Sequence, residues 1–72
     1  SIYPSPFDNI LSLLINSDQS LNVLLYDING RKIFEKEVTQ FDELDLTDYD
    51  SGTYFVRIQN ENIFETRRVV KR

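Results

Sequence analysis

Short runs in which apolar and polar residues alternate dominate the sequence. The clearest run, residues 53–59 (TYFVRIQ), places Tyr54, Val56 and Ile58 on one face of an extended chain. A period of two is typical of a half-buried β-strand, because successive side chains of a strand point to opposite faces. The β-branched and aromatic residues in these runs also favour strands over helices. The pattern therefore predicts an all-β fold.

Turn residues divide the chain into six predicted strands. These are residues 9–15, 21–28, 31–38, 42–46, 53–59 and 63–70. The run at 21–28 is apolar on both faces and predicts a central strand, whereas the acidic run at 42–46 predicts an edge strand. This spacing of strands and turns is typical of an immunoglobulin-like antiparallel β-sandwich of about seven short strands. We expect residues 1–8 to form a junction and residues 9–72 to form the sandwich.

Asn29 and Gly30 lie between two of the predicted strands. Asn-Gly is a strong hairpin signal and predicts a type I′ turn, in which both central residues have positive φ. Arg31 follows the turn and could either pair with Asp27 or face a partner; the pair with Asp27 is the favoured interpretation. Further along, we expect Gly52 to occupy a position that needs positive φ or a close strand approach. Tyr54 is expected to pack inward, with its hydroxyl hydrogen-bonded at an edge.

Composition excludes several classes of function. The 72 residues include no cysteine and no histidine, so disulfides, thiolate metal sites and a histidine general base are all absent. A net charge of −4 argues against nucleic-acid binding, which needs a basic surface. Apolar runs such as residues 13–15 are far too short for a membrane span. No signal peptide opens the chain, and we expect it to be a piece of a longer protein.

The acidic segment 42–50 is the main candidate for metal chemistry. Its five acids are Asp42, Glu43, Asp45, Asp48 and Asp50. They could bind calcium, but their spacing differs from that of an EF-hand loop, and a solvated edge strand with its loop is the favoured interpretation. Whether calcium binds stays undecided at this stage.

Enzymatic chemistry has little support in the sequence. Glycoside hydrolysis by paired carboxylates needs a cleft that a sandwich of this size scarcely provides. A Ser-Lys mechanism needs a buried neutral lysine, whereas Lys32, Lys36 and Lys71 all lie in runs that we expect to be exposed. We therefore predict no catalytic residue, no metal ligand and no cofactor.

Four segments occur in an order that resembles a known family. They are residues 2–7 (IYPSPF), 25–31 (LYDINGR), 46–47 with 51–58 (LT and SGTYFVRI) and 69–72 (VVKR). Together they resemble the type A C-terminal sorting domain of cargo exported by the type IX secretion system of Bacteroidetes. That family shows Y-P-N-P, Y-D-x-x-G-R, L-x-x-G-x-Y-x-x-x-I and a basic-apolar end. Here Ser5 replaces the usual Asn, and Tyr49 replaces a frequent Leu.

The resemblance implies a sorting signal rather than an enzyme. The parent protein would cross the inner membrane, and the domain would be recognised in the periplasm and carried through the outer-membrane translocon. A sortase would then remove the domain and attach the cargo to the cell surface. The expected partners are therefore translocon and sortase proteins, and the expected location is the periplasm in transit, then the cell surface or the extracellular space.

The resemblance also assigns candidate residues to three groups. The recognition group comprises Val69, Val70, Lys71 and Arg72, together with Gly52 and Tyr54; the junction motif comprises Tyr3, Pro4 and Pro6; the hairpin motif comprises Asp27, Asn29, Gly30 and Arg31. We expect the last strand to be read by strand addition. Truncation of residues 69–72 is expected to abolish export while leaving most of the fold.

Other functions stay open from the sequence alone. An immunoglobulin-like or fibronectin-like accessory module could bind carbohydrate or protein at the cell surface, using Phe34, Phe41 or Phe64 as exposed aromatics. A purely structural spacer is a third alternative. Weak homodimerisation through an exposed edge strand also stays open. The sequence names neither the cargo nor the sortase cleavage position.

Overall fold

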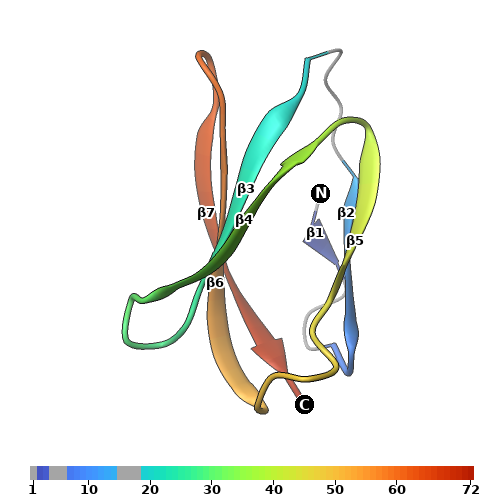
Figure 1. Ribbon diagram of the computed structural model, residues 1–72, viewed down its shortest axis with the longest axis vertical. Helices are drawn as coiled ribbons and strands as arrows, with labels where there is room; N and C mark the ends of the chain where they lie inside the picture. Colours follow the sequence, from blue (N-terminus) through green and yellow to red (C-terminus); the bar gives the residue numbers. More distant parts are fainter. Residues whose placement is uncertain (1, 4–6, 15–18) are drawn as a thin grey trace.

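The chain forms two antiparallel sheets that pack face to face (Figure 1). The computed structural model describes residues 2–3, 7–14 and 19–72. Within these residues there are seven strands: β1 (Ile2–Tyr3), β2 (Ile10–Leu14), β3 (Leu21–Tyr26), β4 (Lys32–Val38), β5 (Phe41–Asp45), β6 (Gly52–Gln59) and β7 (Phe64–Lys71). One sheet has the order β1-β2-β5 and the other the order β4-β3-β6-β7. The predicted all-β sandwich is therefore confirmed.

The core lies between the two sheets and follows the alternation seen in the sequence. In β6, Tyr54, Val56 and Ile58 are buried as predicted. Leu11 and Leu13 of β2 supply the same inward row on the opposite sheet. Burial of such a side chain contributes about 1.5–3 kcal/mol, so these rows hold the sheets together without any covalent link.

The predicted positions of two strands are also confirmed. β3 lies between β4 and β6, and Leu24 is buried on the outer side of the sheet, which explains why this run is apolar on both faces. β5 lies at the edge of the three-stranded sheet, with Leu44 buried and its neighbours Glu43 and Asp45 exposed. Charged side chains on such an edge discourage pairing with other chains.

The β3–β4 turn differs from the predicted type I′ hairpin. Gly30 has a φ of +84°, but no non-glycine residue among those described has a positive φ, so Asn29 does not fit a type I′ turn. The Gly30 amide donates to the Asp27 carbonyl at 3.0 Å, which makes residues 27–30 the turn. The Asp27 carboxylate accepts hydrogen bonds from the amides of Asn29 and Arg31, both at 2.9 Å, and thereby stabilises the longer loop.

Phe7 connects the beginning of the chain to its last strand. Its side chain is fully buried, its amide donates to the Val70 carbonyl at 2.9 Å, and its carbonyl accepts from the Arg72 amide at 2.8 Å. Of the segment predicted as a junction, Ile2–Tyr3 forms β1 beside β2, and Phe7 belongs to the core. Pro4 and Pro6 lie outside the described residues.

Candidate recognition site

Three of the four family-like segments meet at one end of the sandwich. We call this the motif end and define it as residues 27–31, 48–54 and 69–72. The β3–β4 loop, the start of β6 and the end of β7 all lie toward the lower part of Figure 1. In the β6–β7 pairing, Gly52 lies opposite Lys71, and Tyr54 lies opposite Val69. Segments distant in sequence thus form one surface.

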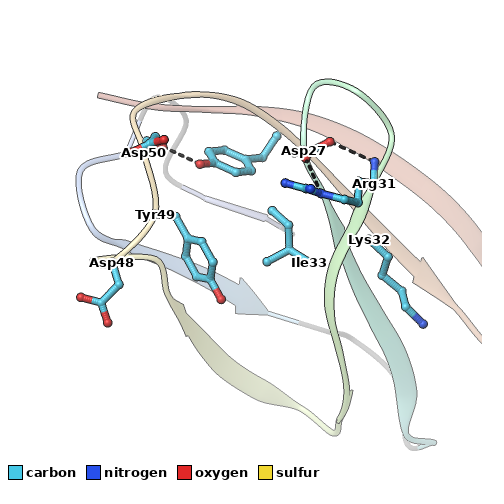
Figure 2. A pocket seen from close by; sticks show the side chains of 8 residues that line it. Asp27, Arg31, Lys32, Ile33, Asp48, Tyr49 and Asp50 are labelled. Carbon is cyan, nitrogen blue, oxygen red and sulfur yellow. Dashed lines mark hydrogen bonds and ion pairs between the residues drawn. The ribbon is translucent and has the colours of Figure 1, made fainter.

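A hollow of about 420 Å³ separates the two loops of the motif end. Figure 2 shows Asp27 and Arg31 of the β3–β4 loop on one side and residues 48–50 on the other, with Ile33 between them. Tyr49 is half-buried and packs against the core, with its ring centroid 6.5 Å from that of Phe34. The replacement of leucine by tyrosine at this position therefore keeps a core-facing side chain.

Asp27 organises the β3–β4 loop through its carboxylate. The backbone amide of Arg31 is the main cause that holds the pKa of Asp27 below its usual value, with further help from the Asn29 amide. The predicted pair with Arg31 is present, with 3.3 Å between the Arg31 Nε and Asp27 Oδ2. The Arg31 side chain is itself largely exposed, so this cation is accessible at the surface.

Tyr54 and Gly52 set the backbone path at the start of β6. The Tyr54 side chain packs inward, and its hydroxyl donates a hydrogen bond to the Asp50 carbonyl, as predicted. Burial is the main cause that raises the pKa of Tyr54, and the Asp50 charge adds to it. Gly52 has a φ of +144°, and a Cβ placed there would meet no atom within 4 Å. Its backbone conformation, and not a close strand approach, accounts for this glycine.

The last strand alternates between buried and exposed residues. Val69 and Lys71 are buried, whereas Val70 and Arg72 are exposed. The Arg72 Nε lies 3.3 Å from an Asp8 carboxylate oxygen. The expectation that Lys71 is exposed was wrong, because it lies on the same inward row as Val69, opposite Gly52, which has no side chain. The stem of a lysine readily covers apolar surface in such a position.

The acidic residues do not gather into a metal site in the part of the chain that the structure describes. No three carboxylates there lie close enough to hold one ion. The Asp42 carboxylate instead pairs with Lys36 at 2.8 Å, and Asp45 accepts hydrogen bonds from Thr47. These contacts lower the pKa of both carboxyls, that of Asp42 chiefly through Lys36 and that of Asp45 chiefly through the Thr47 hydroxyl.

The aromatics considered for carbohydrate binding do not form one platform. Phe34 is half-buried against the core beside Tyr49. Phe41 and Phe64 are exposed, but they lie in different sheets. Phe64 in addition stacks on Arg57. The two exposed rings therefore do not form a joint stacking surface, and their arrangement does not itself favour a carbohydrate module.

The fold and the motif end define a small all-β domain whose distinguishing residues lie on one surface. All 72 residues match the family model described as the secretion system C-terminal sorting domain. The chain therefore belongs to this family of type IX secretion sorting domains. The comparison with curated proteins gave no match.

Membership of the family has two direct consequences. A sorting domain acts as a signal and is not itself a catalyst, and its parent protein is exported through the secretion system to the cell surface or the extracellular space. Within the described residues, the chain forms no helix that is long and apolar enough to cross a membrane.

Sequence reasoning missed two residues that hold the motif end in place. Phe7 was assigned to a junction, although its large aromatic side chain is of a type that often belongs to a core, and it is buried and bonded to the last strand. Asp50 was considered only as an acid, whereas its carbonyl accepts the Tyr54 hydrogen bond. No local pattern marks a backbone acceptor of this kind.

Proposed function

We propose that the domain directs its parent protein through the outer membrane, where the type IX translocon recognises the motif end. The observation that carries the proposal is the convergence of the hairpin motif, the residues around Gly52 and Tyr54, and the last strand on one surface. The proposal is supported because a family signature that is dispersed in the sequence comes together in the fold, where one partner could contact all of it.

The motif residues divide into two groups by exposure. One group maintains the shape of the motif end. Asp27 does so through hydrogen bonds within its loop, Gly52 through its backbone conformation, and Tyr54 and Val69 through burial in the core. Val70, Arg72 and Arg31 expose their side chains, and these are the groups that a partner contacts. Asn29 and Gly30 form the turn that carries Arg31.

At residues 69–72, the last strand presents exposed side chains to a partner, but its outer backbone groups are already hydrogen-bonded. The Val70 carbonyl and the Arg72 amide are already hydrogen-bonded to Phe7, so simple strand addition at residues 69–72 would have to displace that contact. Recognition there therefore uses the exposed side chains of Val70 and Arg72. Truncation of residues 69–72 would also remove the buried Val69, so the expectation that it spares the fold needs revision.

Removal by a sortase forms the second half of the proposal. Tyr3, Pro4 and Pro6 form the junction motif, and prolines favour an extended path that a protease can accept. Phe7, which follows this motif, is bonded to Val70 and Arg72. Because Ile2–Tyr3 already pairs with β2 as part of the sandwich, cleavage upstream of or near Ser1 would release the cargo and leave the domain whole.

A paired substitution tests recognition without removing core residues. Arg72→Gln is compared with Arg67→Gln; both side chains are 61% exposed and both pair with a carboxylate. Each variant is fused to an exported fluorescent reporter in a type IX-competent bacterium. We expect Arg72→Gln to reduce surface display severalfold and Arg67→Gln to leave it unchanged. Equal display of both variants and the parent would contradict recognition at Arg72.

A further inference from the structure

The outer face of the four-stranded sheet has an unusual composition over β6 and β7. This face is the side turned away from β1, β2 and β5. Its side chains over these two strands are Thr53, Phe55, Arg57, Gln59, Phe64, Thr66, Arg68 and Val70. They include two arginines and two phenylalanines but no carboxylate, in a chain whose net charge is −4.

Arg57 is held at the centre of this face with unused hydrogen-bonding capacity. Its guanidinium carbon lies 5.0 Å from the ring centroids of both Tyr26 and Phe64. One terminal nitrogen lies 3.3 Å from the Tyr26 hydroxyl, a neutral partner. The Arg57 Nε is buried and has no hydrogen-bond partner among the described residues. A desolvated donor of this kind is costly unless a partner arrives.

A free strand edge runs beside this face. β7 is an edge strand, and the Val70 carbonyl and Arg72 amide point away from β6 toward Phe7. Since the direction of backbone groups alternates along an antiparallel strand, the amides and carbonyls of Thr66 and Arg68 also point outward. In the described part of the chain, no strand lies against this stretch of β7. Such an edge is a template for an added strand.

We propose that an extended acidic peptide of another protein adds to β7 along residues 64–68 and directs alternate carboxylates onto the outer face. A residue of the added strand that pairs with Arg68 would lie one strand spacing, about 5 Å, from the Arg68 backbone. A side chain opposite Thr66 would share a row with Arg57, about 10 Å distant and within the combined reach of a glutamate and an arginine. The partner motif is thus an alternation of acidic with other residues.

Charge complementarity favours this partner over a second copy of the chain. Antiparallel pairing of two β7 strands about Thr66 would bring four arginines, Arg57 and Arg68 from each copy, onto one continuous face without a carboxylate. A sugar acid could satisfy the arginines but would leave the edge amides and carbonyls unused. The acidic peptide satisfies both.

The proposed peptide site, residues 64–68 with Arg57, shares no residue with the motif end. Residues 64–68 adjoin the β6–β7 turn, whereas the motif end lies at the other end of β7. Binding here can be measured with the chain alone and does not require export. A failure of either proposal therefore leaves the other standing.

The test is a nuclear magnetic resonance titration of the labelled chain with two peptides. The probe is acetyl-Thr-Glu-Val-Glu-Val-Glu-Thr-amide, and its control carries glutamine in place of glutamate. We expect the glutamate peptide to shift the amides of residues 64–68 and to bind roughly tenfold or more tightly than the control, because charge-assisted hydrogen bonds are lost in the latter. Equal binding of the two peptides, shifts elsewhere, or no binding would overturn the proposal.

Variants of the chain separate the side-chain and backbone contributions. Arg57→Gln and Arg68→Gln are each expected to weaken binding of the glutamate peptide roughly tenfold. Thr66→Pro removes one outward amide from an edge position that tolerates proline, and it is expected to abolish binding. Arg67→Gln, on the other face, is expected to have no effect. Loss of binding in Arg67→Gln alone, or self-association through β7 in sedimentation, would refute the assignment.

Discussion

The hydrogen bond from the Tyr54 hydroxyl to the Asp50 carbonyl stabilises the motif end, and its contribution to the free energy of unfolding can be measured. Tyr54→Phe removes the hydroxyl and keeps the buried ring, so no cavity forms. Asp50 is exposed, and water can replace the lost donor at its carbonyl. The net loss should therefore equal an ordinary hydrogen bond, about 1 kcal/mol in the free energy of unfolding.

Tyr49→Phe is the matched control for this substitution. Tyr49 lies in the same hollow and is half-buried, but no hydrogen bond of its hydroxyl is found within the described residues. Thermal unfolding followed by circular dichroism should show a melting temperature about 4–8 °C lower for Tyr54→Phe. Tyr49→Phe should change it little. Equal effects of the two substitutions would refute the role given to the Tyr54–Asp50 bond.

The pH dependence provides a second readout of Tyr54. Because burial raises the pKa of Tyr54 in the folded state, its contribution to stability is complete below the unfolded pKa of about 10 and is lost as the pH rises toward the folded pKa. The parent chain should therefore lose stability above about pH 10. Over this pH range, Tyr54→Phe should lose less stability than either the parent or Tyr49→Phe. An identical alkaline slope in all three would contradict the burial of this hydroxyl.

Three further substitutions test other parts of the fold. Gly52→Ala should cost about 1–2 kcal/mol in urea denaturation because its φ of +144° disfavours a Cβ; an unchanged midpoint would contradict that conformation. Because the pKa of Asp27 is lowered in the folded state, its contribution to stability is present above the unfolded pKa of about 4 and is lost as the pH falls. Asp27→Asn should therefore lose less stability than the parent when the pH is lowered below about 4. An equal loss of stability in both proteins would contradict this role. Leu25→Ala should cost about 2–5 kcal/mol, whereas the exposed Ile28→Ala should cost less than about 0.5 kcal/mol; similar costs would contradict the assigned core.

The strands were predictable because their signal is local. The alternation in residues 53–59 identified β6 and both of its faces, and the continuous apolar run at 21–28 identified the central strand β3. Each of these inferences uses only the period of two and the burial it implies. Strand ends shifted by one or two residues, since hydrogen bonding, and not hydropathy, decides where a strand ends.

The turn type was not predictable from Asn29 and Gly30 alone. The dipeptide fits a two-residue loop, but the Asp27 carboxylate captures the amides of Asn29 and Arg31 and stabilises a longer turn, with Gly30 alone at positive φ. The choice depends on a side chain outside the dipeptide. The Asn-Gly motif carries no information about the Asp27 carboxylate, so it cannot predict which of the two turns forms.

The burial of Lys71 and the contacts of Phe7 depend on pairings between distant segments. Lys71 is buried because Gly52, nineteen positions earlier, lies opposite it, and Phe7 reaches the last strand from the first segment. Local patterns at either end carry no information about the partner. The order of the four family-like segments did predict the family correctly, although their assembly into one surface became visible only in the fold.

The central claim is that this chain suffices as a sorting label, and transfer to a foreign cargo tests it most directly. An exported fluorescent reporter is fused to the whole chain or left without it, in a type IX-competent bacterium and in the same strain lacking the translocon. We predict surface display of the reporter, with the domain removed, only for the fusion in the competent strain. Periplasmic retention of the fusion in that strain would contradict the claim.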